Sequence, residues 1–296
     1  MDNIKILVKA LNLSFQKRRL AVRLWAINLL FAIFAVAPFF FIMTQHMSHS
    51  FAADRALQRL DIFWLGDFIT RYMNVAPAVT GAALLALALY LLLTVFLNGG
   101  VIGGLNRPEG RTTLADFFHD CGLYFWRFLR LALLSIPVYL VILAIGLPLL
   151  RALLSLLNRR ATTEWPAMIA SNLRFLAIVL LLGIVAMFFD YVKIALVRAG
   201  RSQVLRETWQ TLKFIGRRFF RAWGLYLLAG LVFVTLTLLY LEIARILPKA
   251  RAHWVGLFFL WQQFYILCRQ WSKVLFFASG LTFREKYQIQ TEENTK

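Results

Sequence analysis

The stretch from Trp254 to Phe283, WVGLFFLWQQFYILCRQWSKVLFFASGLTF, decides how the rest of the chain is interpreted. It is apolar enough for a membrane helix, yet Gln262, Arg269 and Lys273 recur in it at spacings of seven and four residues. On an α-helix of 3.6 residues per turn these three side chains share one face, with Gln263 and Gln270 at its edge. A charge that faces lipid at depth costs roughly 2.5 kcal/mol or more. This polar face is therefore expected to contact protein or water.

The composition of the whole chain indicates a membrane protein. Of 296 residues, 60% are hydrophobic and 16% are charged, and the mean hydropathy is +0.68. Soluble domains usually carry about a quarter charged residues. The net charge is +19, but the basic residues adjoin apolar runs, so anionic headgroups are the expected partner and nucleic acid is not. The two cysteines, Cys121 and Cys268, form no disulfide or metal-binding pattern and are expected to be reduced core residues.

Apolar runs along the chain predict an all-α, polytopic membrane helical bundle of six transmembrane helices. We expect one transmembrane domain over residues 1–296. The predicted spans are 24–43, 78–97, 131–150, 174–192, 223–241 and 254–278. Pro137 and Pro148 are expected to bend or end the third span.

Three basic amphipathic segments are predicted to lie along the cytoplasmic membrane surface, around Ile4–Phe15, Thr113–Arg127 and Ser202–Arg218. Each combines apolar or aromatic side chains with lysine and arginine, which is typical of interfacial helices. Thr113 has capping-box spacing to Asp116, and Ser202 is a candidate N-cap.

The distribution of positive charge orients these helices. Of the 33 lysines and arginines, 23 fall in the N-terminal segment, in 98–130, in 190–221 and from residue 269 onward, and 10 fall on the other side. Cytoplasmic loops carry the excess of basic residues. The sequence therefore predicts a multi-pass protein of the bacterial inner membrane with both termini in the cytoplasm.

The motif search gives no metal site, no cofactor and no catalytic set. His46 and His49 have helical metal-ligand spacing but lack a third ligand, so we expect a solvated loop. The glycines of the NGGVIGGLN stretch, 98–106, fit neither a Walker loop nor a dinucleotide fingerprint. A tight cytoplasmic turn is expected there, and a backbone opening against a ligand is the alternative. His119 and Cys121 point apart on a helix, which disfavours a catalytic dyad.

Some short motifs resemble those of uncharacterised bacterial six-span membrane proteins, including the membrane region attached to some glycerophosphodiester phosphodiesterases. The resemblance rests on Gly99 to Gly104 with Gly110-Arg111, on Asp190-Tyr191, and on Arg269-Gln270-Trp271. The metal-binding phosphodiesterase domain of those proteins is absent from this sequence. The resemblance therefore implies a helical membrane module and no hydrolase activity.

Three functions follow as hypotheses. The first is a non-catalytic membrane module that binds a partner protein or anionic lipid in assembly or regulation. The second is a permease-like protein that moves an anionic or amphipathic solute along the polar face of the sixth helix. The third, an intramembrane enzyme, lacks any recognisable catalytic motif. The candidate binding residues are a hypothetical intramembrane polar cluster of Asp190, Lys193, Gln262, Arg269, Gln270 and Lys273.

Within that cluster we expect an ion pair between Asp190 and Arg269. Each ends an uncharged run of fifteen residues, so both lie roughly 22 Å from the outer ends of their spans. Gly183 and Ala186 share a face with Asp190 and would admit a second helix. The pair either fixes helix packing or serves as a gate or anion-binding point.

Overall fold

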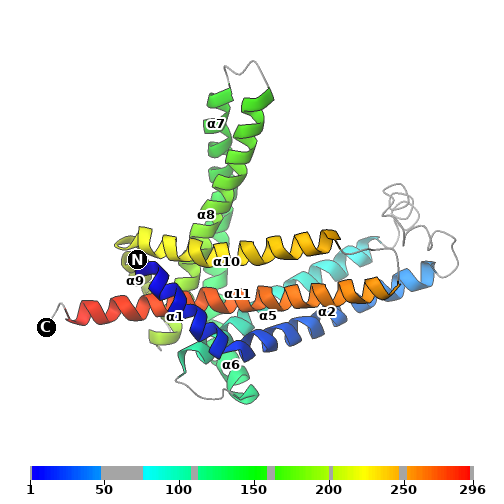
Figure 1. The fold of residues 1–296 in the computed structure, drawn as a ribbon, viewed down its shortest axis with the longest axis horizontal. Coiled ribbons are helices and arrows are strands. Elements are labelled where there is room, and N and C mark those ends of the chain that lie inside the picture. The colour runs from blue at the N-terminus through cyan, green and yellow to red at the C-terminus, as the bar shows by residue number, and fades with distance from the viewer. Residues whose placement is uncertain are drawn as a thin grey trace. The chain divides into compact units, whose positions relative to one another are not determined.

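A computed structural model describes residues 2–47, 76–107, 113–158, 164–199, 203–246 and 252–293 (Figure 1). Every regular element in these ranges is helical, which confirms the all-α prediction for the described chain. The helices are α1 (Asp2–Gln16), α2 (Arg18–Met47), α5 (Ala76–Asn106), α6 (Leu114–Val141), the π-helix η1 (Ile142–Gly146), α7 (Leu147–Asn158), α8 (Glu164–Ala199), α9 (Val204–Gly216), α10 (Phe219–Ile246) and α11 (Ala252–Glu293). The loop expected at His46 is wrong, because His46 lies in the last turn of α2, and His49 lies outside the described residues.

Five described helices are long and apolar enough to cross a membrane: Arg18–Phe41, Val79–Asn106, Leu114–Ala152, Ser171–Ala199 and Phe219–Ile246. They cover the first five predicted spans except residues 42–43 and 78, and they reach further toward the predicted cytoplasmic side. The sixth predicted span, 254–278, lies in α11, which is not among the five. Its glutamines and basic residues interrupt the apolar sequence and lower its hydropathy.

The chain divides into two compact units, which are described separately. The first, here the inner unit, contains residues 1–17, 95–232 and 273–296. The second, here the outer unit, contains residues 18–94 and 233–272. The names follow the predicted orientation only.

The core of the inner unit joins helices from both ends of the sequence. Buried side chains from α1, α8, α9, α10 and α11 pack together there, namely Ile6, Met187, Tyr191, Ile215, Ala222, Leu225, Phe283 and Tyr287. Polar contacts tie α1 to the same core, because Asn3 donates to the Arg221 carbonyl at 3.1 Å and Lys286 pairs with Asp2 at 3.2 Å. The N-terminal helix is thus an integral part of this unit.

Aromatic and amide contacts hold the outer unit together. Tyr240 of α10 stacks on Tyr265 of α11 with ring centroids 4.2 Å apart, and the Tyr265 hydroxyl lies 3.2 Å from Thr237 Oγ1. The indole Nε1 of Trp25 in α2 donates to Gln263 at 3.2 Å. One polar residue at the edge of the α11 face therefore contacts protein, as that face predicts.

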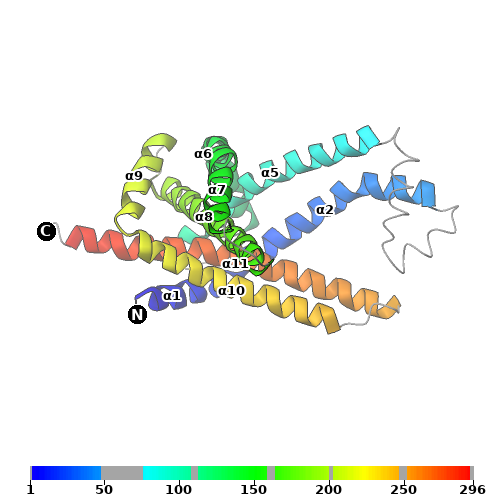
Figure 2. The ribbon, with the colours of Figure 1, turned by 90° about the horizontal axis from the view of Figure 1, so that it is seen from above.

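The α6–α8 hairpin consists of α6, η1, α7 and α8 and belongs to the inner unit. Figures 1 and 2 show α7 beside the first part of α8. The helix continues through Pro137 and Pro148, and the irregularity that we expected appears between them as the π-helical turn η1. The segment Thr113–Arg127 is not a separate helix, because α6 runs without a break from Leu114 to Val141, and its position along the membrane surface stays a prediction.

The expected turn at Gly99 to Gly104 is also wrong, because these residues lie inside α5. A Cβ on Gly99 would lie 3.0 Å from the Asp120 carbonyl oxygen, and one on Gly103 would lie 2.7 Å from Asp120 Oδ2. Gly99 and Gly103 stand one turn apart, as in a GxxxG packing motif. The glycines therefore let α5 and α6 pack at close range.

Candidate functional site

Helix α9 presents an unusual pattern of burial. It buries the polar residues Glu207 and Thr211, which are each 4% exposed. Its exposed side carries large apolar side chains at helical spacing, Leu205, Trp209 and Leu212, with 70%, 58% and 46% of their surface exposed. A helix on a water-soluble protein normally does the reverse. This arrangement suits a helix whose outer side contacts lipid.

The buried charge of α9 has a counterpart within the inner unit. Arg284 of α11 is largely buried, and burial is the main cause that lowers the pKa of its guanidinium, followed by repulsion from Arg198. Glu207 acts on the same pKa in the opposite direction. Arg198 in turn forms an ion pair with Glu285. Complementary charge thus explains how α9 buries Glu207 on the same side as Val204 and Ile215.

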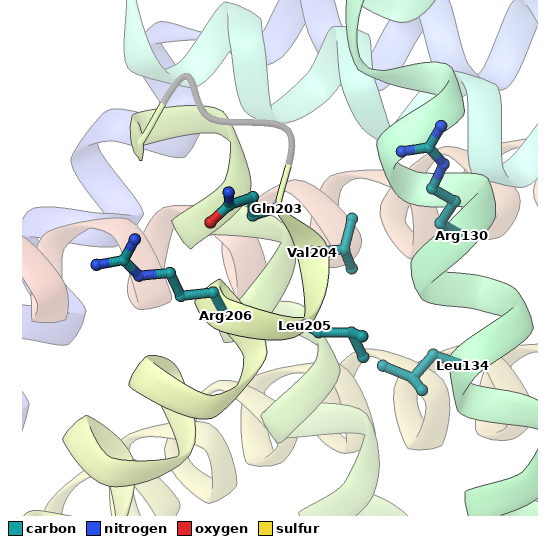
Figure 3. A pocket seen from close by; sticks show the side chains of 6 residues that line it. All are labelled: Arg130, Leu134, Gln203, Val204, Leu205 and Arg206. Carbon is teal, nitrogen blue, oxygen red and sulfur yellow. The ribbon is translucent and has the colours of Figure 1, made fainter.

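A cavity of about 580 Å³ opens where the start of α9 meets α6. Its lining contains apolar and basic side chains together: Arg130, Leu134, Gln203, Val204, Leu205 and Arg206. In Figure 3, Leu134 and Leu205 point toward one another, and the Arg206 side chain extends away from Arg130. This cavity, lined by apolar side chains and two arginines, is called the α6–α9 pocket below.

The electrostatics of the α6–α9 pocket favour an anionic ligand. No carboxylate whose side chain the structure describes forms an ion pair with Arg130 or Arg206. The first backbone N–H groups of α9 also border the pocket, and a helix N-terminus carries partial positive charge. The N-cap of α9 is Gln203, which makes no side-chain capping hydrogen bond. The predicted cap, Ser202, lies outside the described residues.

Part of the predicted polar cluster belongs to the inner unit. Lys193 Nζ donates to Asp190 Oδ1 at 2.8 Å, and the Tyr226 hydroxyl of α10 donates to Asp190 Oδ2 at 3.4 Å. The Trp223 ring of α10 lies 3.1 Å from the position of a Cβ on Gly183, so a second helix does approach there as expected. Tyr226 was not among the predicted residues, and no sequence spacing links it to Asp190.

The other predicted cluster residues are distributed over α11. Gln262, Arg269 and Gln270 belong to the outer unit, whereas Lys273 belongs to the inner unit with Asp190. Arg269 is exposed, while both glutamines are half-buried. The Asp190–Arg269 ion pair would join the two units and stays a prediction.

A network of charged side chains links the end of α5 to α6. Arg107 pairs with both Asp116 and Asp120 at 2.8 Å, and Asp120 is 95% buried with its Oδ2 beside Gly103. The hydrogen bond to Asp116 is the main cause that raises the pKa of Arg107, and burial acts in the opposite direction. The predicted capping box is confirmed, since Thr113 and Asp116 bond reciprocally. The i, i+4 spacing of Gly99 and Gly103 is the sequence feature from which this packing could have been predicted.

Comparison of the chain with protein-family models, with curated proteins and with solved structures finds no match. Among the described residues no group of three or more histidine, cysteine, aspartate or glutamate side chains could hold a metal ion. Cys121 is buried against Gly100. The α6–α9 pocket is the candidate site that we take further, because it combines basic and apolar lining residues.

Proposed function

We propose that the protein is a non-catalytic, multi-pass protein of the bacterial inner membrane that binds anionic phospholipids at the cytoplasmic face. The observation that carries this proposal is the outward apolar side of α9 next to the two arginines of the α6–α9 pocket. A phospholipid would place its phosphate near Arg130 and Arg206 and its acyl chain along Leu134 and Leu205. Arginine suits phosphate because its planar fork donates more than one hydrogen bond. Such a module would help to assemble or regulate a membrane protein partner.

The test uses the purified full chain in nanodiscs of phosphatidylcholine and phosphatidylglycerol. Lipids retained by the protein are counted by native mass spectrometry. The double variant Arg130→Gln with Arg206→Gln is compared with Arg19→Gln with Arg217→Gln, which removes the same charge from exposed positions outside the pocket. We expect the pocket variant alone to lose enrichment of phosphatidylglycerol. Equal enrichment in both variants would contradict the proposal.

The permease-like function remains a second candidate, and the Asp190–Lys193–Tyr226 contacts favour it because charged groups inside spans often mark solute paths. Such a path would wet the polar face of α11. We therefore expect Gln262→Cys to react with a membrane-impermeant thiol reagent, and Leu260→Cys, which is 65% exposed and apolar in its setting, to stay unreactive. Protection of both cysteines would remove this candidate.

A further inference from the structure

The α6–α8 hairpin carries a second cavity, of about 260 Å³, near its closed end. It is lined by Leu147, Arg151, Ser171, Arg174, Phe175 and Ile178, which come from α7 and α8. Two guanidinium groups and one hydroxyl thus border an apolar wall. This cavity is called the α7–α8 pocket below.

The α7–α8 pocket repeats the chemistry of the α6–α9 pocket. No carboxylate whose side chain the structure describes pairs with Arg151 or Arg174. In each pocket an apolar side chain follows an arginine by one helical turn: Leu134 lies beyond Arg130, and Ile178 lies beyond Arg174. On α7 the order is reversed, and the apolar Leu147 precedes Arg151 by four residues. In all three cases the apolar residue lies on the side of the arginine that faces the middle of the hairpin.

The separation of the two pockets matches the thickness of a bilayer core. Arg130 and Arg151 stand 21 residues apart on a helix that continues from α6 through η1 into α7, and residues 131–150 between them carry no charge. At 1.5 Å per residue this distance is about 30 Å. The hydrocarbon core of a bilayer is also about 30 Å thick. A helix that crosses the bilayer here therefore places Arg130 and Arg151 at opposite boundaries of the hydrocarbon.

We propose that the α7–α8 pocket binds the phosphodiester headgroup of an anionic phospholipid in the leaflet opposite to the one that α9 contacts. The guanidinium groups of Arg151 and Arg174 and the Ser171 hydroxyl donate hydrogen bonds to the phosphate oxygens. The acyl chain continues along Phe175 and Ile178 toward the membrane centre. This inference rests on the proposed function and extends it to a second site, so that the hairpin holds one headgroup in each leaflet.

Photo-crosslinking tests the α7–α8 pocket separately from the α6–α9 pocket. The full chain is placed in nanodiscs that contain phosphatidylglycerol or phosphatidylcholine with a diazirine near the carbonyl end of an acyl chain, and crosslinked peptides are mapped by mass spectrometry. With phosphatidylglycerol we expect crosslinks at 147–151 and 171–178, several-fold above those with phosphatidylcholine. Inorganic phosphate at high concentration should reduce crosslinking by phosphatidylglycerol only if the pocket binds the free anion rather than the lipid.

Arginine variants then show which side chains cause the preference for phosphatidylglycerol over phosphatidylcholine. Each basic side chain near a membrane surface contributes about a fivefold preference for anionic lipid. Arg151→Gln and Arg174→Gln should each reduce crosslinking at 147–151 and 171–178 by about that factor, and Arg151→Lys should keep most of it. Arg245→Gln, at the predicted outer end of α10, is the matched control and should change nothing.

The outcomes separate the two proposals. Equal crosslinking by the two lipids at 171–178, together with selective crosslinking at 130–134 and 203–206, would overturn the α7–α8 site and leave the proposed function intact. Equal crosslinking at both pockets would overturn both. Competition by inorganic phosphate at 171–178 would replace the lipid by a free phosphate ligand. The wild-type comparison decides these outcomes even if a variant fails to fold.

Discussion

At the scale of single residues, the α5–α6 contact depends on the absence of side chains. A methyl group on Gly103 would lie 2.7 Å from Asp120 Oδ2 and 2.8 Å from Asp120 Cβ. Asp120 has little freedom to retreat, because Arg107 holds its other oxygen at 2.8 Å. We expect Gly103→Ala to lower the free energy of unfolding by about 1–3 kcal/mol through overpacking.

Gly122 on α6 provides the control for Gly103. A Cβ there meets no atom within 4 Å, so Gly122→Ala adds a methyl group in open space. It should be neutral or raise stability by about 0.5–1 kcal/mol, because alanine favours the helix. Both variants are compared by thermal unfolding of purified protein in one detergent. A Gly103→Ala protein as stable as Gly122→Ala would contradict the close packing of α5 on α6.

Arg107 offsets the free-energy cost of burying the Asp120 carboxylate. Removing the guanidinium leaves a carboxylate that is 95% buried without its partner. We expect Arg107→Gln to cost about 1–3 kcal/mol, the penalty of a buried group left unsatisfied. Adding Asp120→Asn should recover part of the loss, which a denaturation series on the single and double variants would measure. Arg19→Gln serves as the exposed control, and the absence of any recovery would show that the two residues act independently.

At the scale of elements, α9 is defined by the contrast between its sides. Leu205, Trp209 and Leu212 are exposed in a row, and Lys213 lies over the Trp209 ring at 5.3 Å. We expect a nitroxide label at Leu212→Cys to lie about 5–10 Å below the headgroup boundary, which is the depth of interfacial helices. A label at Gln210→Cys, on another exposed side of α9, should report water. Electron paramagnetic resonance with oxygen and a nickel chelate measures both depths, and equal aqueous exposure would remove α9 from the membrane surface.

Sequence patterns predict the middle of each helix more accurately than the residues at which the helix begins and ends. The uncharged runs give the middle of the first five spans, and the Thr113 capping box marks where α6 begins. Helix continuity past Arg127 could have been predicted, because no glycine or proline separates the basic amphipathic segment from the apolar run that follows it. The α5 glycines mislead for the opposite reason, since paired glycines usually end a helix and here one of their helix faces is covered by α6.

In the candidate site, contacts within one helix could be predicted from the sequence, and contacts between helices could not. Lys193 lies three residues from Asp190 on one helix, so their contact follows from local spacing. Tyr226, by contrast, reaches Asp190 from α10, and the Arg130 and Arg206 that flank one pocket come from α6 and α9. Contacts between helices depend on how the helices pack. A single sequence contains no direct record of that packing.

At the scale of the whole molecule, the number of spans depends on whether α11 crosses the membrane. Its 42 residues extend about 63 Å, which is ample for a span. Its polar side chains nevertheless keep it out of the five clearly apolar helices. Partners within the protein reduce the cost of such polar groups, as Trp25 does for Gln263 at 3.2 Å. This contact lowers the cost of Gln263 in a sixth span.

The number of spans fixes the side on which the C-terminus lies. Six spans return it to the side of the N-terminus, and five leave it on the other side. Because 23 of the 33 lysines and arginines would then face the cytoplasm, we expect six spans and two cytoplasmic termini. Alkaline phosphatase fused after Lys296, Arg111 or Arg206 should be inactive, and fusions after Ser50, Arg160 or Lys249 should be active. Green fluorescent protein fused after Lys296 should fluoresce. An active phosphatase after Lys296 with a dark fluorescent fusion would place α11 on one side of the membrane and reduce the spans to five.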